Sequence, residues 1–168
     1  MVPYPSWLNA GDTSWQLTAA TLVGLMSLPG LAVLYGGLVQ RKWAVNTMIM
    51  AFSGFCLVLI VWVLWVFKMG FGHAWIGTFL GRPGPVIGSF NEQGQAHIPS
   101  VSGAGLMPKF RFSQSALVYF QFVFAAITPL LLLGSVVGRI SFKVWLVFVP
   151  LWSTFAYAVN AFLLWGGG

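Results

Sequence analysis

Residues 43–67 read WAVNTMIMAFSGFCLVLIVWVLWVF, a run of 25 residues without Asp, Glu, Lys or Arg. A helix needs about 20 apolar residues to cross the hydrocarbon core of a bilayer. Three more uncharged runs of similar length occupy residues 13–40, 112–138 and 144–168. Because that core holds no water, a spanning segment must satisfy its own backbone hydrogen bonds, which a helix does. The sequence therefore predicts an all-α polytopic membrane protein with four transmembrane helices.

The composition is typical of a membrane protein. Hydrophobic residues make up 58% of the 168 residues and charged residues only 6%, whereas soluble domains carry roughly 25% charged residues. The net charge of +6 comes from basic residues that are too few and too scattered to follow a phosphate backbone. We therefore expect the lipid bilayer as a partner, and no nucleic acid.

The charged residues mark the connections between the apolar runs. We expect an extracytoplasmic N-terminus over 1–12, helices over 13–40, 43–67, 112–138 and 144–165, and an extracytoplasmic loop over 68–111. The short connections hold Arg41, Lys42, Arg139 and Lys143. The long loop has as many basic residues, but short loops carry the orientation signal better, and they favour the cytoplasm. This places the N-terminus outside, in a multi-pass protein for which we expect the plasma membrane.

Local signals refine this division. Asp12, Thr13 or Ser14 could cap the first helix by accepting a hydrogen bond from its opening turn. Inside that helix, Pro29 and Gly30 predict either a simple kink or a functional break. The long loop contains GRPGPVIGSFNEQGQAHIPSVSGAG, residues 81–105, which has no helical period and predicts irregular structure, either a lid or a variable insertion.

The chain offers no catalytic group at membrane depth. None of the four apolar runs contains an acid or a histidine, and Cys56 is the one cysteine. His73 and His97 lie in the long loop, where a solvated histidine is the default interpretation. We therefore expect no enzyme, no cofactor and no metal site.

Aromatic residues are the more informative candidates. Phe120 and Phe124 are four residues apart, so they stack on one helix face, where they either gate a narrow pore or simply pack against a neighbouring helix. Helical spacing alone favours packing. Trp165 ends the fourth run, where it serves either as an interfacial anchor or as a wall for a cation, since an indole face attracts ammonium-type cations.

Several longer motifs, taken in order, resemble one family. GDTSWQLTAATLVGLMSLPGLAVLYGGLVQRKWAVN at 11–46 resembles the first helix and hinge of the ammonium transporter (Amt/Mep/Rh) family, especially its plant and microbial Amt members. FQFVFAAIT at 120–128, GSVVGRISF at 134–142 and FVPLWSTFAYAVNAFLLWGGG at 148–168 are similar to the third and fourth helices of that family.

The resemblance implies a trimeric, channel-like transporter that binds ammonium in an outer vestibule lined by aromatic rings. Trp165 matches the vestibule tryptophan, and Phe120 and Phe124 match the two stacked rings that close the path below it. The expected vestibule is thus Phe120, Phe124 and Trp165, with Phe120 and Phe124 as the gate. Pro129 departs from the family, which has an apolar non-proline residue there.

The resemblance also implies that the 168 residues are an N-terminal fragment. A full member has eleven membrane helices and continues past the glycines to a buried aspartate and then to two pore histidines. The implied function is ammonium transport, with ammonium or ammonia as substrate, and the fragment is expected to be inactive alone. The alternative is a non-transporting fragment that joins full-length subunits, so the expected partners are a homotrimer or such a hetero-association.

Overall fold

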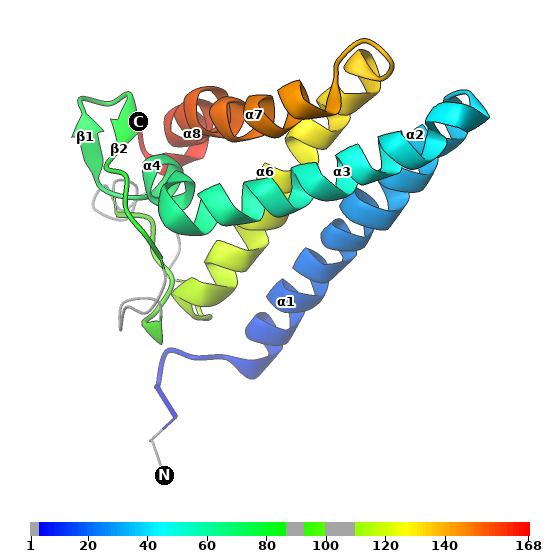
Figure 1. Ribbon diagram of the computed structural model, residues 1–168. Helices are drawn as coiled ribbons and strands as arrows, with labels where there is room; N and C mark the ends of the chain where they lie inside the picture. Colours follow the sequence, from blue (N-terminus) through cyan, green and yellow to red (C-terminus); the bar gives the residue numbers. More distant parts are fainter. Residues whose placement is uncertain (1–3, 87–92, 100–109) are drawn as a thin grey trace.

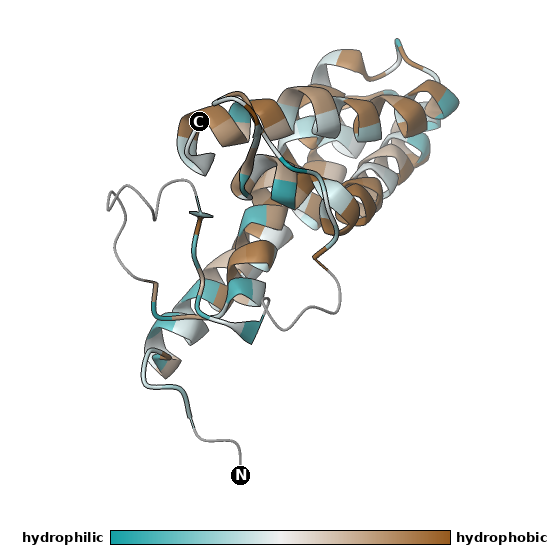
Figure 2. Cartoon of the chain, turned by 90° about the vertical axis from the view of Figure 1, so that its left-hand side faces the viewer, coloured by the Kyte–Doolittle hydropathy of each residue, from teal (hydrophilic) through white to brown (hydrophobic). Residues whose placement is uncertain are grey.

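Among the residues that the structure describes, four helical segments are long and apolar enough to cross a membrane, as expected from the four uncharged runs (Figure 1). The computed structural model describes residues 4–86, 93–99 and 110–168. The four spans are Ala10–Leu38, Arg41–Phe71, Gln114–Val136 and Phe142–Gly166. Apolar residues dominate these helices (Figure 2). The prediction of an all-α fold with four spanning helices is confirmed.

Three of the spans combine α-helix with π-helical turns, labelled η. The first is α1 (Ala10–Leu25), η1 (Met26–Gly30) and α2 (Leu31–Leu38); the second is α3 (Arg41–Val61), η2 (Trp62–Val66) and α4 (Phe67–Phe71). The third is α6 (Gln114–Val136) alone, and the fourth is α7 (Phe142–Trp152), η4 (Ser153–Tyr157), α8 (Ala158–Ala161) and η5 (Phe162–Gly166).

Prolines inside the spans do not end them. Pro29 lies within η1, where the wider π-helical turn absorbs the missing backbone donor and the helix continues to Leu38. Pro129 is buried inside α6, which runs through it without interruption. Directly before Pro129, the hydroxyl of Thr128 donates to the carbonyl of Phe124, one turn back along the helix, at 2.7 Å. The departure from the family pattern at Pro129 therefore leaves the third span helical.

The ends of all four spans differ from the sequence-based expectation by one to four residues, most at the start of the first span and the end of the second. The first helix begins at Ala10 because the side chain of Asn9 accepts a hydrogen bond from the backbone N–H of Asp12, at 3.0 Å. Asn9 is therefore the cap, and not one of the three later residues. The second span continues to Phe71, past Lys68, since a cation is favourable in the last turn of a helix.

A small hairpin follows the second span, within the loop expected over 68–111 and mostly before its irregular part at 81–105. Strands β1 (Ala74–Ile76) and β2 (Leu80–Gly81) pair antiparallel. Figure 1 shows this hairpin beside α4 and close to the C-terminal end of the chain. Residues 74–81 show no alternation of apolar and polar side chains, so the sequence did not predict this strand pairing.

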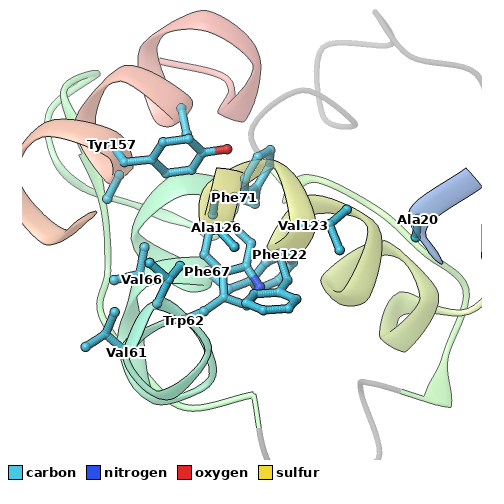
Figure 3. Packing of buried hydrophobic residues seen from close by; sticks show 14 of the residues in the cluster. Ala20, Val61, Trp62, Val66, Phe67, Phe71, Phe122, Val123, Ala126 and Tyr157 are labelled. Atoms are coloured by element: carbon cyan, nitrogen blue, oxygen red, sulfur yellow. The ribbon is translucent and has the colours of Figure 1, made fainter. Parts of the chain in front are cut away.

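Trp62 lies at the centre of the core (Figure 3). Its side chain is fully buried and makes edge-on contacts with Phe67, Phe71 and Tyr157, with ring centroids 5.5, 6.1 and 6.2 Å apart. Its indole N–H donates to the carbonyl of Val118 at 3.0 Å. The second, third and fourth spans are therefore joined around one indole ring.

Candidate functional site

A cavity of about 500 Å³ lies at the end of the bundle where α1 and α6 begin and the fourth span finishes. This volume is in the range of small-molecule sites. The cavity is lined by residues from three spans and from the segments that precede α6: Gln16, Ile98, Phe110, Phe112, Leu117, Phe120, Gln121, Phe124 and Trp165. The structure therefore brings the three aromatic residues expected at a vestibule, Phe120, Phe124 and Trp165, to one cavity.

Two contacts between α1 and the region of α6 position this cavity. The backbone N–H of Asn9 donates to the carbonyl of Arg111 at 2.8 Å, which fixes the start of the first helix beside the start of the third. Further along, the hydroxyls of Thr21 and Tyr119 lie 3.4 Å apart. These contacts hold Gln16, which lies between Asn9 and Thr21 along the first helix, at the cavity wall.

Phe120 and Phe124 contact each other, but they do not form a parallel stack. Their ring centroids are 5.1 Å apart and their planes are inclined by 56°. The expectation of two stacked rings is corrected accordingly. Inclined rings are the favourable arrangement because the edge of one ring is positive and the face of the other is negative. The side chain of Phe124 is 37% exposed, so it retains free surface toward the cavity.

Trp165 is held at the cavity by the glycines that follow it. A Cβ atom on Gly166 would overlap with the carbonyl oxygen of Gly70, so a side chain there would push the fourth span away from the second. Gly167 has φ of +97°, a left-handed conformation that glycine adopts without strain. The indole of Trp165 also contacts the ring of Phe71, with centroids 6.4 Å apart.

Sequence reasoning missed two polar residues of the cavity, Gln16 and Gln121. Both side chains are half-buried, and they are the two amide groups among the described lining residues. An amide carbonyl accepts hydrogen bonds from a cation such as ammonium. The neighbouring position in FQFVFAAIT could have indicated Gln121, since Phe120, Gln121 and Phe124 lie on adjacent parts of one helix face. Nothing in the sequence places Gln16 against them.

The other polar candidates lie elsewhere. His73 and His97 are exposed, and both line a separate cavity. Within the described parts of the chain, no three His, Cys, Asp or Glu side chains are grouped as metal ligands would be. Asp12 and Arg111 approach to 3.9 Å at the surface, where such a pair contributes about 0–1 kcal/mol.

Four apolar spans with an aromatic cavity at one end define a polytopic helical membrane protein. A sequence model of the Ammonium Transporter Family matches residues 14–168. The chain belongs to this family, as the motif resemblance predicts. Its relatives are transporters, a class of proteins that are not enzymes.

Individual relatives agree with this assignment. The chain is 51% identical over 164 residues to Ammonium transporter 2 of Arabidopsis thaliana, an alignment that covers 98% of this chain and 34% of the relative. It is 48% identical over 171 residues to Ammonium transporter 3 member 2 of rice, Oryza sativa subsp. japonica, covering 96% of this chain and 35% of the relative. The crystal structure of Candida albicans Mep2 superimposes with a TM-score of 0.73 at 27% identity, over 95% of this chain and 32% of Mep2. The chain thus spans about a third of the length of the relatives it matches.

Proposed function

We propose that the chain serves ammonium transport across a membrane by capturing the cation in the aromatic cavity. The observation that supports this role is the convergence of Phe120, Phe124 and Trp165 on one cavity of about 500 Å³. These residues come from two different spans. Family membership supports the substrate, since the relatives described above are ammonium transporters.

The chemistry of capture follows from the lining. Ammonium loses hydration when it enters an apolar cavity, so other groups must replace the lost water contacts. Each aromatic face supplies about 0.5–2 kcal/mol of cation–π attraction, depending on how far it is desolvated. The carbonyl oxygens of Gln16 and Gln121 supply hydrogen-bond acceptors for N–H groups. Sodium, which has no N–H to donate, gains less from this set of groups.

The same cavity explains how passage would be restricted. Phe120 and Phe124 lie one turn apart on α6, and their rings contact each other. In our proposal these rings close the path from the cavity toward the interior of the bundle. A cation bound against Trp165 therefore passes further only when the rings of Phe120 and Phe124 rotate.

Binding of methylammonium, a labelled analogue of ammonium, tests the capture step. The purified chain in nanodiscs should bind methylammonium saturably, with competition by ammonium and not by sodium. Replacing Gln121→Leu removes one acceptor while keeping the size of the side chain, and should weaken binding by about tenfold, because a hydrogen bond to a charged group contributes about 1.5–3 kcal/mol. Gln40→Leu is the matched control, since Gln40 is exposed between the first two spans. Equal affinity of both variants and the parent chain would refute capture in this cavity.

We further propose that the chain associates with other subunits of its family, either as a homotrimer or with longer relatives. The first span supports this idea, because only 17% of its most apolar 18 residues are buried, against 50% in the third span. Trp15, Val33 and Leu38 on this span are exposed. Chemical crosslinking in membranes, with the chain alone and with a tagged full-length relative, distinguishes the two assemblies. A chain that stays monomeric in both experiments contradicts the proposal.

For the orientation, we propose an outside N-terminus in the plasma membrane. Basic residues at the two short connections, Arg41, Lys42, Arg139 and Lys143, support it. In a Cys56→Ser background, a membrane-impermeant maleimide should label Ser6→Cys on intact cells and label Gln40→Cys only after permeabilisation. The reverse pattern would overturn the orientation, and no labelling of Ser6→Cys on intact cells would argue against the plasma membrane.

A further inference from the structure

A second cavity, of about 640 Å³, lies where the second span ends and the hairpin begins. Four of its lining residues are basic or can become so: Lys68, His73, Arg82 and His97. None of the described residues that line it is Asp or Glu. This basic cavity is separate from the aromatic cavity, because the two share no lining residue.

The hairpin brings two of the basic residues to the end of the helix. Gly81 packs so closely on the second span that a Cβ atom there would lie 2.5 Å from the carbonyl oxygen of Lys68. Across the hairpin, the backbone N–H of Arg82 donates to the carbonyl of His73 at 2.8 Å. The close approach at Gly81 therefore sets Arg82 beside the last turn of the second span, where Lys68 lies.

Packing also fixes Lys68 and His97. Lys68 is half-buried, and its Cδ would lie 3.4 Å from a Cβ atom on Gly84, so the aliphatic stem runs along the cavity wall. His97 is anchored through its backbone, whose N–H donates to the side-chain oxygen of Gln114 at 2.8 Å. The buried side chain of Gln114 thus ties the segment 93–99 to the start of α6.

The fold therefore gathers positive groups in a hollow whose described lining residues include no acid. Cations brought together in this way repel one another, and a bound anion relieves that repulsion. Lysine offers three donors and arginine a planar fork, which together suit the oxygens of a phosphate group. We propose that the basic cavity binds a phosphate-type oxyanion, with Lys68 and Arg82 as its principal ligands.

The position of the site admits two sources for that oxyanion. Lys68 lies in the last turn of a spanning helix, at the depth of lipid headgroups, while the side chain of Arg82 is exposed beyond it. Inorganic phosphate from solution and the phosphate of an anionic lipid present the same chemistry to these two side chains. The test is therefore made in two arms.

In the first arm, the purified chain in a neutral detergent is titrated with inorganic phosphate by calorimetry. In the second, the chain in phosphatidylcholine nanodiscs, with or without phosphatidic acid, is released into a mass spectrometer and its retained lipid is counted. Lys68→Gln and Arg82→Gln should each weaken binding by about tenfold or more in the arm that binds. Lys143→Gln, which removes the same charge from an exposed position in the first turn of α7, should bind like the parent chain.

The outcomes separate cleanly. Saturable phosphate binding that depends on Lys68 and Arg82 supports the site with a soluble ligand, and selective retention of phosphatidic acid with the same dependence supports it with a lipid headgroup. Binding in neither arm, or an equal loss in Lys143→Gln, overturns the proposal. Should Lys68→Gln fail to fold by circular dichroism, the exposed Arg82→Gln still decides the result. Methylammonium capture is measured in a different cavity, so either proposal can fail without the other.

Discussion

Replacing Trp165→Leu isolates the contribution of the indole face to cation capture. Leucine keeps apolar bulk at the end of η5 but has no π face. Cation–π attraction ranges from about 0.5–1 kcal/mol at exposed sites to about 2 kcal/mol when the pair is desolvated. Because the side chain of Trp165 is 41% exposed, a value near 1 kcal/mol is appropriate. Since about 1.4 kcal/mol corresponds to tenfold, methylammonium should bind about fivefold more weakly to the variant.

Equilibrium binding of labelled methylammonium to the chain in nanodiscs measures this change. Trp75→Leu is the matched control, because Trp75 is 58% exposed on β1 and does not line the aromatic cavity. A Trp165→Phe variant should recover part of the affinity, since phenylalanine restores a weaker π face. If Trp165→Leu and Trp75→Leu bind methylammonium as tightly as the parent chain while their helix content is unchanged, the cation–π argument is refuted.

Two further predictions concern the packing that positions the cavity. Gly166→Ala should lower the free energy of unfolding by about 1–3 kcal/mol, because its Cβ atom would overlap with the carbonyl of Gly70. Gly37→Ala is the control: its added Cβ would have no atom within 4 Å, so this variant should be neutral or stabilising in thermal unfolding. Trp62→Phe should lower the free energy of unfolding by about 1–3 kcal/mol, because the partly buried carbonyl of Val118 loses its indole donor. An unchanged melting temperature would show that this hydrogen bond contributes nothing.

The sequence by itself predicted the four spans because their signal is local. The free energy of transferring a helix from water to lipid depends on the length and composition of the segment. Residues 43–67 and the other three uncharged runs are long enough and apolar enough to make this transfer favourable. The ordered motifs likewise predicted the family, since they need no knowledge of packing. Phe120 and Phe124 were paired from spacing alone, because residues four apart always share a helix face.

The path of the backbone near prolines needed the structure. Pro29 was consistent with a kink or a break, and the outcome, a π-helical turn, depends on the neighbouring turns that accommodate it. The position of the helix cap at Asn9 likewise depends on the local backbone conformation. Asn9 and the three later candidates all have suitable side chains, and the choice rests on which residue takes an extended backbone conformation.

The aromatic cavity itself is a product of tertiary structure. The hydropathy of a spanning helix is nearly the same whichever face it turns to its neighbours, so the sequence does not state that Gln16 of α1 meets Gln121 of α6 and Trp165 of η5. That meeting depends on close approaches such as Gly166 on Gly70, and on hydrogen bonds between spans such as Trp62 to Val118. The sequence determined which segments enter the membrane, because transfer energies are local; packing between helices decided which side chains form a site, because contacts between distant residues set the rotation and spacing of each helix.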